Sequence, residues 1–251
     1  MNLLSGLEKF GLDVSEDMDI FEEDKPKTGT GTEAVEEKSD IPTEDMFLLD
    51  KGIRCPVCDK VFKTKMIKNG RVKRLESDKD LRPRHQYIDT LKYDVCSCPH
   101  CGYTAMTRFF PNITSVQSKL IKENICSKFH AQIEPEPAVY DYDRALERYK
   151  LSLFNTIVKK GKTSEKAYTC LKIAWLYRGK AETLDVATEE GKAAIAECKK
   201  EEEAFYKQAY DGMLKAVSTE MFPICGMDQG TVDYPVSYTH LRAHETRRHL
   251  V

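Results

Sequence analysis

The chain has 251 residues, a formal net charge of −2 at pH 7 and 41% hydrophobic residues, a composition that excludes fibrous and wholly disordered proteins. The small net charge averages two opposed segments, because residues 11–50 carry 14 acidic and 3 basic side chains, whereas residues 51–92 carry 13 basic and 5 acidic ones. The N-terminal region lacks the apolar core of a secretory signal, and no window approaches the roughly 20 apolar residues that span a bilayer. We therefore expect a cytoplasmic protein whose 9 cysteines are metal ligands or buried thiols rather than disulfides.

Residues 1–50 are predicted to form an acidic, largely disordered arm. The segment combines acidic runs with Pro26 and the Thr-Gly-Thr-Gly-Thr stretch at 28–32, and it has too few apolar residues to offset the entropy of ordering. The paired glycines do not indicate a phosphate loop, because no Gly-Lys-Ser/Thr follows them.

Residues 51–110 are predicted to form a small β module that binds a metal. Two Cys-Pro-x-Cys turns, at 55–58 and 98–101, have the form of paired zinc knuckles, in which each turn directs both thiolates to one side and two turns complete a tetrahedron. The predicted ligands of one structural Zn²⁺ are Cys55, Cys58, Cys98 and Cys101. Four thiolates leave no open position for substrate or water, so this site favours a structural metal over a catalytic one.

The 39 residues between the two turns exceed the usual ribbon spacing of roughly 15–20. An inserted hairpin accounts for the length, and Asn69-Gly70, between Lys65–Lys68 and Arg71–Arg74, is a strong hairpin signal. A second extended run is expected at Leu91–Val95. Cys96 and His100 are further donors close to the second turn, and either one is an alternative ligand.

Two other kinds of chemistry compete with the structural metal. Cys98-Pro-His-Cys101 has the form of an oxidising thiol oxidoreductase site, although such a site needs a strand before it and a helix after it. The basic stretch also suggests a ribbon that binds nucleic acid, and its alternative is a solvated basic face or an internal partner for the acidic arm. The candidate nucleic-acid-binding residues are Lys63, Lys65, Lys68, Arg71, Lys73 and Arg74.

Residues 111–234 are predicted to be helical. Thr114 is a candidate N-cap for a helix with Val116, Leu120 and Ile121 on one face. Three longer helices are expected from about Asp143 to a glycine cap at Gly161, from about Ser164 to Thr183, and from about Ala187 to Thr219. Cys126, Cys170 and Cys198 lie on predicted helices and are expected to be small core residues. The spacing of small and aromatic residues resembles that of tetratricopeptide-type hairpins, although no clean period of about 34 residues fits.

Residues 235–251 resemble the translation of a DNA sequencing adapter. This tail is therefore excluded from reasoning about the fold, and the native sequence is expected to be cut off near Tyr234. His244, Glu245 and His249 do not form the helical zinc-protease motif, because the two histidines are five residues apart instead of four.

The paired knuckles, the segment Ile88–Val95 and the sequence Cys98-Pro-His-Cys-Gly-Tyr103 occur here in an order that resembles a bacterial family known as domain of unknown function 2225. The resemblance covers roughly residues 45–234. It implies a zinc-ribbon-like front joined to tetratricopeptide-like helices, and no established reaction.

We therefore expect an α+β protein, mostly α, with a small zinc-ribbon-like β module followed by a helical-hairpin domain. The leading functional hypothesis is a non-enzymatic zinc-binding protein whose packed helices present a surface to a protein or peptide partner. The alternatives are a nucleic-acid-binding zinc ribbon and a thiol-disulfide oxidoreductase.

Overall fold

A computed structural model describes residues 42–131, 136–225, 227 and 232, all of which belong to one compact unit, Pro42–Val251. The acidic arm predicted for residues 1–50 and the tail predicted for residues 235–251 lie outside the described residues, except for positions 42–50. These nine positions form the 3₁₀ turn η2 (Glu44–Phe47) and the first part of a strand. Phe47 and Leu48 are buried there, so apolar contact orders this end of the predicted arm.

Two antiparallel strands, β1 (Leu48–Arg54) and β2 (Val61–Ile67), form the first hairpin. Their register pairs Leu48 with Ile67 and Arg54 with Val61, and the tip of the hairpin is the first Cys-Pro-x-Cys turn. The hairpin predicted at Asn69-Gly70 is therefore wrong. That dipeptide lies in the 3₁₀ turn η3 (Asn69–Arg71). The predicted second strand, Arg71–Arg74, offers only Val72 as an apolar side chain, whereas β2 buries Phe62 and Thr64 in alternation.

A second, shorter hairpin consists of β3 (Val95–Ser97) and β4 (Thr104–Met106), with the second Cys-Pro-x-Cys turn at its tip. The extended run predicted for Leu91–Val95 is only partly correct, because residues up to Tyr93 belong to the 3₁₀ turn η4 (Thr90–Tyr93). The side chain of Asp89 accepts a hydrogen bond from the backbone N–H of Leu91 at 3.0 Å and starts this turn.

Four α-helices follow the hairpins, so the fold is α+β and mostly α, as the sequence predicts. Their bounds are α1 (Ser115–Ile121), α2 (Tyr142–Val158), α3 (Thr163–Thr183) and α4 (Glu189–Thr219), and the π-helical turn η5 (Lys122–Cys126) continues α1. Thr114 caps α1 in a capping box with Gln117, which confirms the predicted cap. Val116 is 69% exposed, so it does not lie on the buried face to which it was assigned.

The end of α2 differs from the prediction in one detail of the backbone. The left-handed residue is Lys160, with φ 52°, rather than Gly161. Glycine is still required at 161, because a Cβ there would lie 2.7 Å from Cγ2 of Thr156. The need is for space against the last turn of the helix and not for a left-handed φ.

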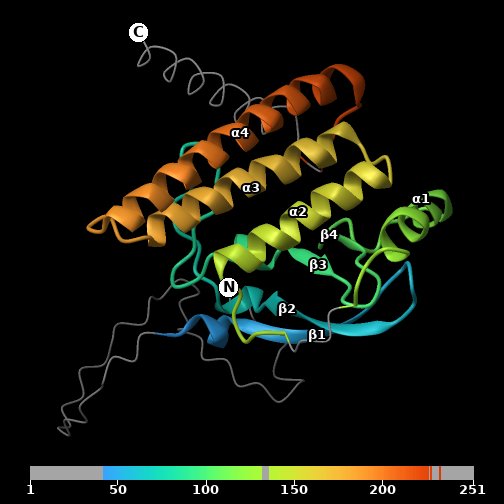
Figure 1. The fold of residues 1–251 in the computed structure, drawn as a ribbon, viewed down its shortest axis with the longest axis horizontal. Helices are drawn as coiled ribbons and strands as arrows, with labels where there is room; N and C mark the ends of the chain where they lie inside the picture. Colours follow the sequence, from blue (N-terminus) through green and yellow to red (C-terminus); the bar gives the residue numbers. More distant parts are fainter. Residues whose placement is uncertain (1–41, 132–135, 226, 228–231, 233–251) are drawn as a thin grey trace, which may run out of the picture. The chain divides into compact units, whose positions relative to one another are not determined.

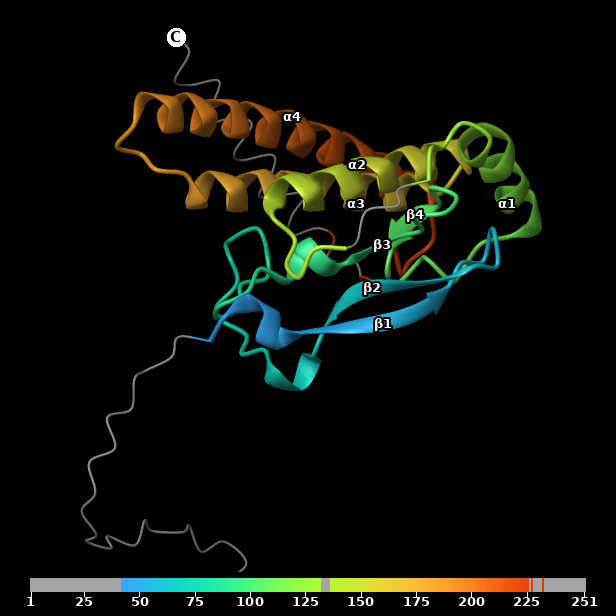
Figure 2. The ribbon, with the colours of Figure 1, turned by 60° about the horizontal axis from the view of Figure 1, so that its bottom comes forward.

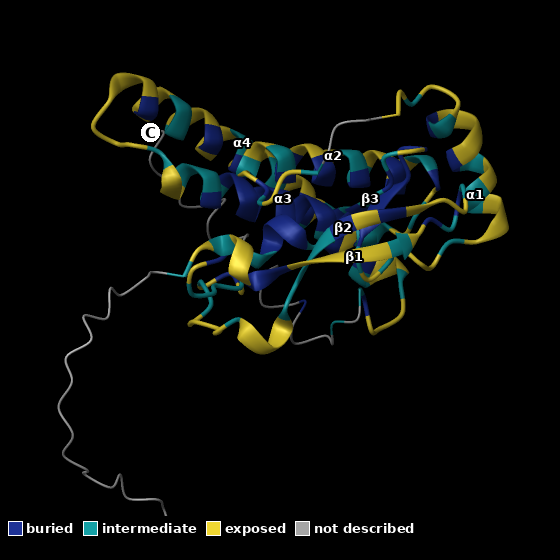
Figure 3. Ribbon diagram, turned by 90° about the horizontal axis from the view of Figure 1, so that it is seen from below, coloured by how far each residue is buried: buried dark blue, intermediate teal, exposed yellow. Residues whose placement is uncertain are grey.

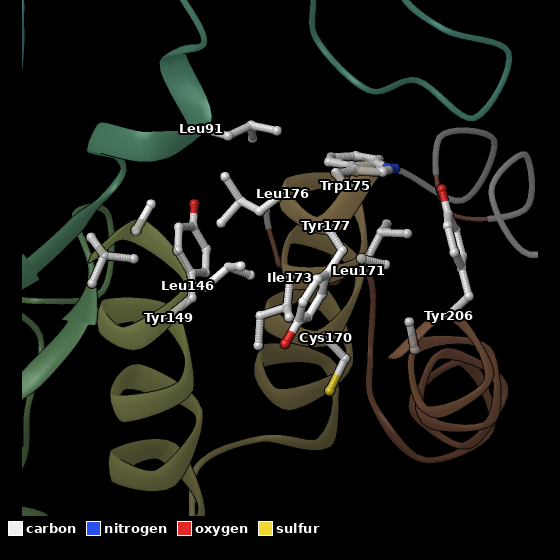
Figure 4. Packing of buried hydrophobic residues seen from close by; sticks show 14 of the residues in the cluster. Leu91, Leu146, Tyr149, Cys170, Leu171, Ile173, Trp175, Leu176, Tyr177 and Tyr206 are labelled. Atoms are coloured by element: carbon white, nitrogen blue, oxygen red, sulfur yellow. The ribbon is translucent and has the colours of Figure 1, made fainter. Parts of the chain in front are cut away.

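The three long helices lie side by side in one layer, and the two hairpins lie against one face of that layer (Figures 1 and 2). The buried residues gather between the layers, whereas most of β1 is exposed (Figure 3). The middle helix, α3, is buried on several sides, and Leu171, Ile173 and Leu176 are at most 3% exposed (Figure 4). Cys170 and Cys198 are buried in this core, as predicted, and Cys126 is partly buried against the cysteine turns.

Charged side chains attach the segment between η3 and η4 to α3 and α4. Asp80 is completely buried and accepts hydrogen bonds from Nε1 of Trp175 at 2.8 Å and from Nη2 of Arg178 at 2.9 Å. Arg82, 3% exposed, donates to both carboxylate oxygens of Glu182 at 2.9 and 3.2 Å. These contacts fix an irregular segment that has few apolar side chains of its own.

The stability of the protein should depend on pH through His85 in this segment. Burial and the positive charge of Arg74 lower the pKa of His85, and the negative charge of Asp89 offsets this only in part. The unfolded chain then binds more protons than the folded one, so this contribution is fully present above the unfolded pKa of about 6.5 and is lost as the pH falls through that value. We expect urea unfolding between about pH 8 and 5 to show a shallower loss of stability for His85→Gln. The exposed His130 provides the control, and an identical slope for His130→Gln and His85→Gln would contradict the assignment.

Candidate metal centre

The two Cys-Pro-x-Cys turns are alike in their backbone structure. In the first, the N–H of Cys55 donates to the carbonyl of Lys60 at 3.0 Å and the N–H of Asp59 donates to the carbonyl of Cys55 at 2.9 Å. In the second turn, the N–H of Cys98 donates to the carbonyl of Tyr103 at 2.9 Å and the N–H of Gly102 donates to the carbonyl of Cys98 at 3.0 Å. The residue after each turn is left-handed, with φ 61° at Asp59 and 75° at Gly102. Both hairpins therefore present a cysteine pair in the same way.

The tips of the two hairpins meet and bring the four predicted ligands together. The Sγ atoms of Cys55, Cys58, Cys98 and Cys101 all lie within 4.8 Å of one another. The Sγ–Sγ distances are 3.7 Å for Cys55 and Cys101 and 3.7 Å for Cys58 and Cys98. A tetrahedral metal ion with metal–sulfur bonds of about 2.3 Å has sulfur atoms about 3.8 Å apart. The cluster is therefore compatible with one bound metal ion.

Mutual hydrogen bonding favours ionisation of the Cys98 thiol and, together with burial, opposes ionisation of the Cys101 thiol. Cys55 and Cys98 are 0% exposed and Cys101 is 6% exposed. Hydrogen bonds with Cys101 and Cys55 lower the pKa of Cys98 to about 2, whereas hydrogen bonds to Cys55 and Cys98 raise the pKa of Cys101. Backbone N–H groups of His100 and Cys101 also donate to the Cys98 sulfur. The remaining thiol protons leave when a metal ion binds, so the affinity for metal should rise with pH.

The two spare donors lie outside this cluster. The thiol of Cys96 is buried and lies 3.7 Å from Oγ1 of Thr107, and burial raises its pKa. His100 is exposed, between two members of the cluster in sequence. Neither residue belongs to the group of four side chains that could hold a metal.

The surroundings of Cys98 and Cys101 differ from those of an oxidoreductase motif. The turn connects strands β3 and β4, whereas a thioredoxin-like site has its cysteines at the start of a helix. The Sγ of Cys98 also lies 3.7 Å from that of Cys58, on the other hairpin. This arrangement favours the metal over dithiol chemistry.

The six candidate nucleic-acid-binding residues lie on β2, directly before and at the end of η3, and in the residues after it. Lys65 forms an ion pair with Asp50 at 2.8 Å, and the ammonium group of Lys68 donates to the carbonyl of Met46 at 3.1 Å. The remaining four, Lys63, Arg71, Lys73 and Arg74, are exposed, and Arg74 contacts Ser77 at 3.3 Å. The role of all six remains a prediction.

The sequence reasoning missed the residues that connect the metal centre to the helices. Nδ2 of Asn155 on α2 donates to the carbonyl of Gly102 at 3.1 Å, and Nη2 of Arg148 donates to the carbonyl of Val95 at 2.8 Å. A stripe of polar residues at helical spacing, Arg148, Ser152 and Asn155, was the available signal. The prediction of α2 used only its apolar positions.

The second turn should be sensitive to any side chain at Gly102. A Cβ there would lie 2.5 Å from Cδ2 of Phe129, and the φ of 75° is unfavourable for other residues. We expect Gly102→Ala to lower the free energy of unfolding by about 2 kcal/mol or more and to speed metal loss to a chelator. Gly70→Ala is the control, because nothing lies within 4 Å of a Cβ at that position. Equal stability of the two variants in thermal unfolding would contradict this reading.

The fold and the site define an α+β protein in which a tetracysteine cluster that could hold a metal ion lies at the joined tips of two hairpins, packed against a helical layer. The chain belongs to the family of uncharacterized proteins conserved in bacteria known as domain of unknown function 2225, whose model matches residues 48–251. No curated protein and no solved structure matches the chain. Among the described residues, no helix is both long enough and apolar enough to cross a membrane.

Proposed function

We propose that the protein is a non-enzymatic zinc-binding protein of the cytoplasm, in which one structural Zn²⁺ holds the hairpins against a helical layer that binds a protein partner. The observation that carries the metal part is the pair of 3.7 Å Sγ–Sγ distances between the hairpins. An all-thiolate, tetrahedral set of ligands suits Zn²⁺. The reduced thiols of the cytoplasm are compatible with such a site.

A closed coordination sphere supports a structural role for the metal. Four cysteine ligands leave no position at which water or substrate could bind. Burial of Cys55, Cys98 and Cys101 further separates the metal from solvent. The metal would then act by fixing the hairpin tips, and through Asn155 and Gly102 it would stabilise the position of α2.

Helix α2 offers the surface that we assign to the partner. Phe154 and Ile157 are 51% and 52% exposed, although both are large and apolar. They lie three residues apart and therefore on one face of the helix, which is the face opposite to Asn155. A protein segment with apolar side chains is the partner that this face fits.

Cobalt substitution tests the proposed coordination. Co²⁺ bound by four thiolates should give the intense absorption of a tetrahedral site, and azide or cyanide should leave the spectrum unchanged because no position is open. A spectrum that shifts on addition of these anions would show an exchangeable ligand and overturn the structural role. Metal analysis that finds no zinc in protein purified under reducing conditions would overturn the proposal for zinc.

The assignment of the partner surface is tested separately. A protein partner identified by cross-linking to Phe154→p-benzoylphenylalanine should bind the wild-type chain in calorimetry and bind the variant Phe154→Ser/Ile157→Ser at least tenfold more weakly. The matched control is Glu147→Gln, an exposed change on the same helix. Equal affinity of all three proteins would contradict the proposed surface.

A further inference from the structure

A cavity of about 460 Å³ lies between α3, η4, the end of β2 and the segment after it. Its volume is in the range of about 300–1,000 Å³ found for small-molecule sites. Three residues of α3 line it at helical spacing, namely Tyr168, Lys172 and Trp175. Leu91 and Asp94 line the facing wall. No member of the cysteine cluster takes part in the cavity.

Opposite charges lie next to each other in this cavity. The ammonium group of Lys172 donates to Oδ2 of Asp94, and Lys172 is only 6% exposed. Lysine has three donors, so this ion pair leaves others available. Within the described part of the chain, Oδ1 of Asp94 accepts no hydrogen bond from another residue. The cavity therefore offers one cation with spare donors beside one anion with a spare acceptor.

A buried hydroxyl group next to this ion pair also lacks a partner. Tyr149 is 0% exposed, and its hydroxyl has no hydrogen-bond partner among the described residues. Figure 4 shows this hydroxyl pointing from α2 toward Leu91, a lining residue of the cavity. Burial and the charges of Asp94 and Tyr168 raise the pKa of Tyr149, so it is a neutral donor. An unpaired buried donor calls for a partner that the described residues do not supply, such as a water molecule or a polar group of a bound molecule.

The rim of the cavity carries a strained residue. Leu81 has φ 66° and is 39% exposed, although its neighbours Asp80 and Arg82 are 0% and 3% exposed. The ionic contacts of those neighbours hold the backbone of Leu81 in a conformation that leucine rarely adopts. Strain of this kind is concentrated at ligand clamps and active sites. The segment thus presents an apolar side chain to whatever enters the cavity.

We propose that this cavity binds a free α-amino acid with an apolar side chain, in its zwitterionic form. Its carboxylate takes the spare donors of Lys172, and its ammonium group takes the spare acceptor of Asp94. Its side chain packs against Trp175 and Leu81. Because Lys172 and Asp94 neutralise each other, a ligand with a single charge would leave the site with a net charge, whereas a zwitterion leaves it neutral. This activity is independent of the metal centre and of the partner surface on α2.

The position of Trp175 permits a direct test, because it is the only tryptophan in the chain. Leucine or methionine titrated into the full-length protein should change its fluorescence to saturation. N-acetyl-leucine and leucine methyl ester each lack one charge and should bind at least tenfold more weakly. Absence of any change up to millimolar amino acid, or equal affinity for leucine and both derivatives, would overturn the proposal.

Variants locate the binding in the cavity. Leu81→Gly removes the apolar rim but suits the positive φ, so the fold should be retained while the affinity for leucine falls severalfold. Tyr87→Gly is the matched control, since Tyr87 is also exposed with φ 66° but does not line the cavity. Lys172→Met should lose at least tenfold in affinity, with folding checked by circular dichroism. Unchanged affinity in Leu81→Gly, or an equal loss in Tyr87→Gly, would overturn the assignment even where Lys172→Met does not fold.

Discussion

Cys98→Ser should abolish zinc binding and cooperative folding of both hairpins. Structural zinc in small domains contributes about 10–16 kcal/mol at pH 7, which is comparable to the whole stability of about 5–15 kcal/mol of a typical domain. Cys98 is completely buried and lies 3.7 Å from Cys58 of the other hairpin. Loss of this ligand therefore separates the two tips. Mass spectrometry of the metal content and thermal unfolding by circular dichroism measure the two effects.

The neighbouring thiol provides a matched control for this experiment. Cys96 is 2% exposed and lies on β3, two residues before Cys98, but its Sγ faces Thr107. Cys96→Ser should retain one zinc per chain and unfold only slightly earlier than the wild type. Cys98→Ser protein that keeps one zinc and the unfolding temperature of the wild type would disprove the site, and loss of zinc in Cys96→Ser would extend the ligand set.

The cysteine cluster could be predicted from the sequence because local spacing determines the geometry of each pair. A Cys-x-x-Cys turn places two sulfurs together whatever the rest of the fold does, so Cys55 with Cys58 and Cys98 with Cys101 required no knowledge of tertiary structure. Helix α3 was predictable for a similar reason, since its apolar positions repeat at helical spacing from Ala167 to Trp175.

The hairpins could not be placed as reliably, because their register depends on which strand face is buried. Asn69-Gly70 has the sequence of a tight turn, but the second strand that was expected to follow it does not form. The cysteine turns took that role instead, and each is the tip of a hairpin. Tertiary burial of Phe62 and Thr64 outweighed the local preference of the dipeptide.

The contacts of the charged segment between η3 and η4 could not be predicted from the sequence, for a different reason. Its partners are about a hundred positions away in the chain, as for Arg82 with Glu182 and Asp80 with Arg178. The basic side chains of this region suggested a solvated face or a nucleic-acid site. In the structure, Arg82 is instead buried in an ion pair, because an acidic residue on α3 faces it.

Asp80→Asn should be among the most destabilising single changes outside the metal centre. The Asp80 carboxylate is 0% exposed and accepts hydrogen bonds from Trp175, Arg178 and the hydroxyl of Tyr206. Removing one member of a buried charge pair costs about 3–5 kcal/mol, and the remaining contacts of Arg178 with Glu202 and Asp78 place the expected loss at the lower end of this range. We expect a loss of this size in urea unfolding, followed by both circular dichroism and the fluorescence of Trp175.

A second ion pair of helix α3, with a more exposed carboxylate, shows whether the loss of stability comes from burial or from charge alone. Asp143 is bonded to Lys180 of α3 but is 69% exposed, so Asp143→Asn should cost at most about 1 kcal/mol. If the two variants lost equal stability, the contribution of Asp80 would be that of a surface charge. A large loss in Asp80→Asn alone would show that a buried carboxylate holds the segment before η4 on the helices, and this same segment positions Leu81 at the cavity.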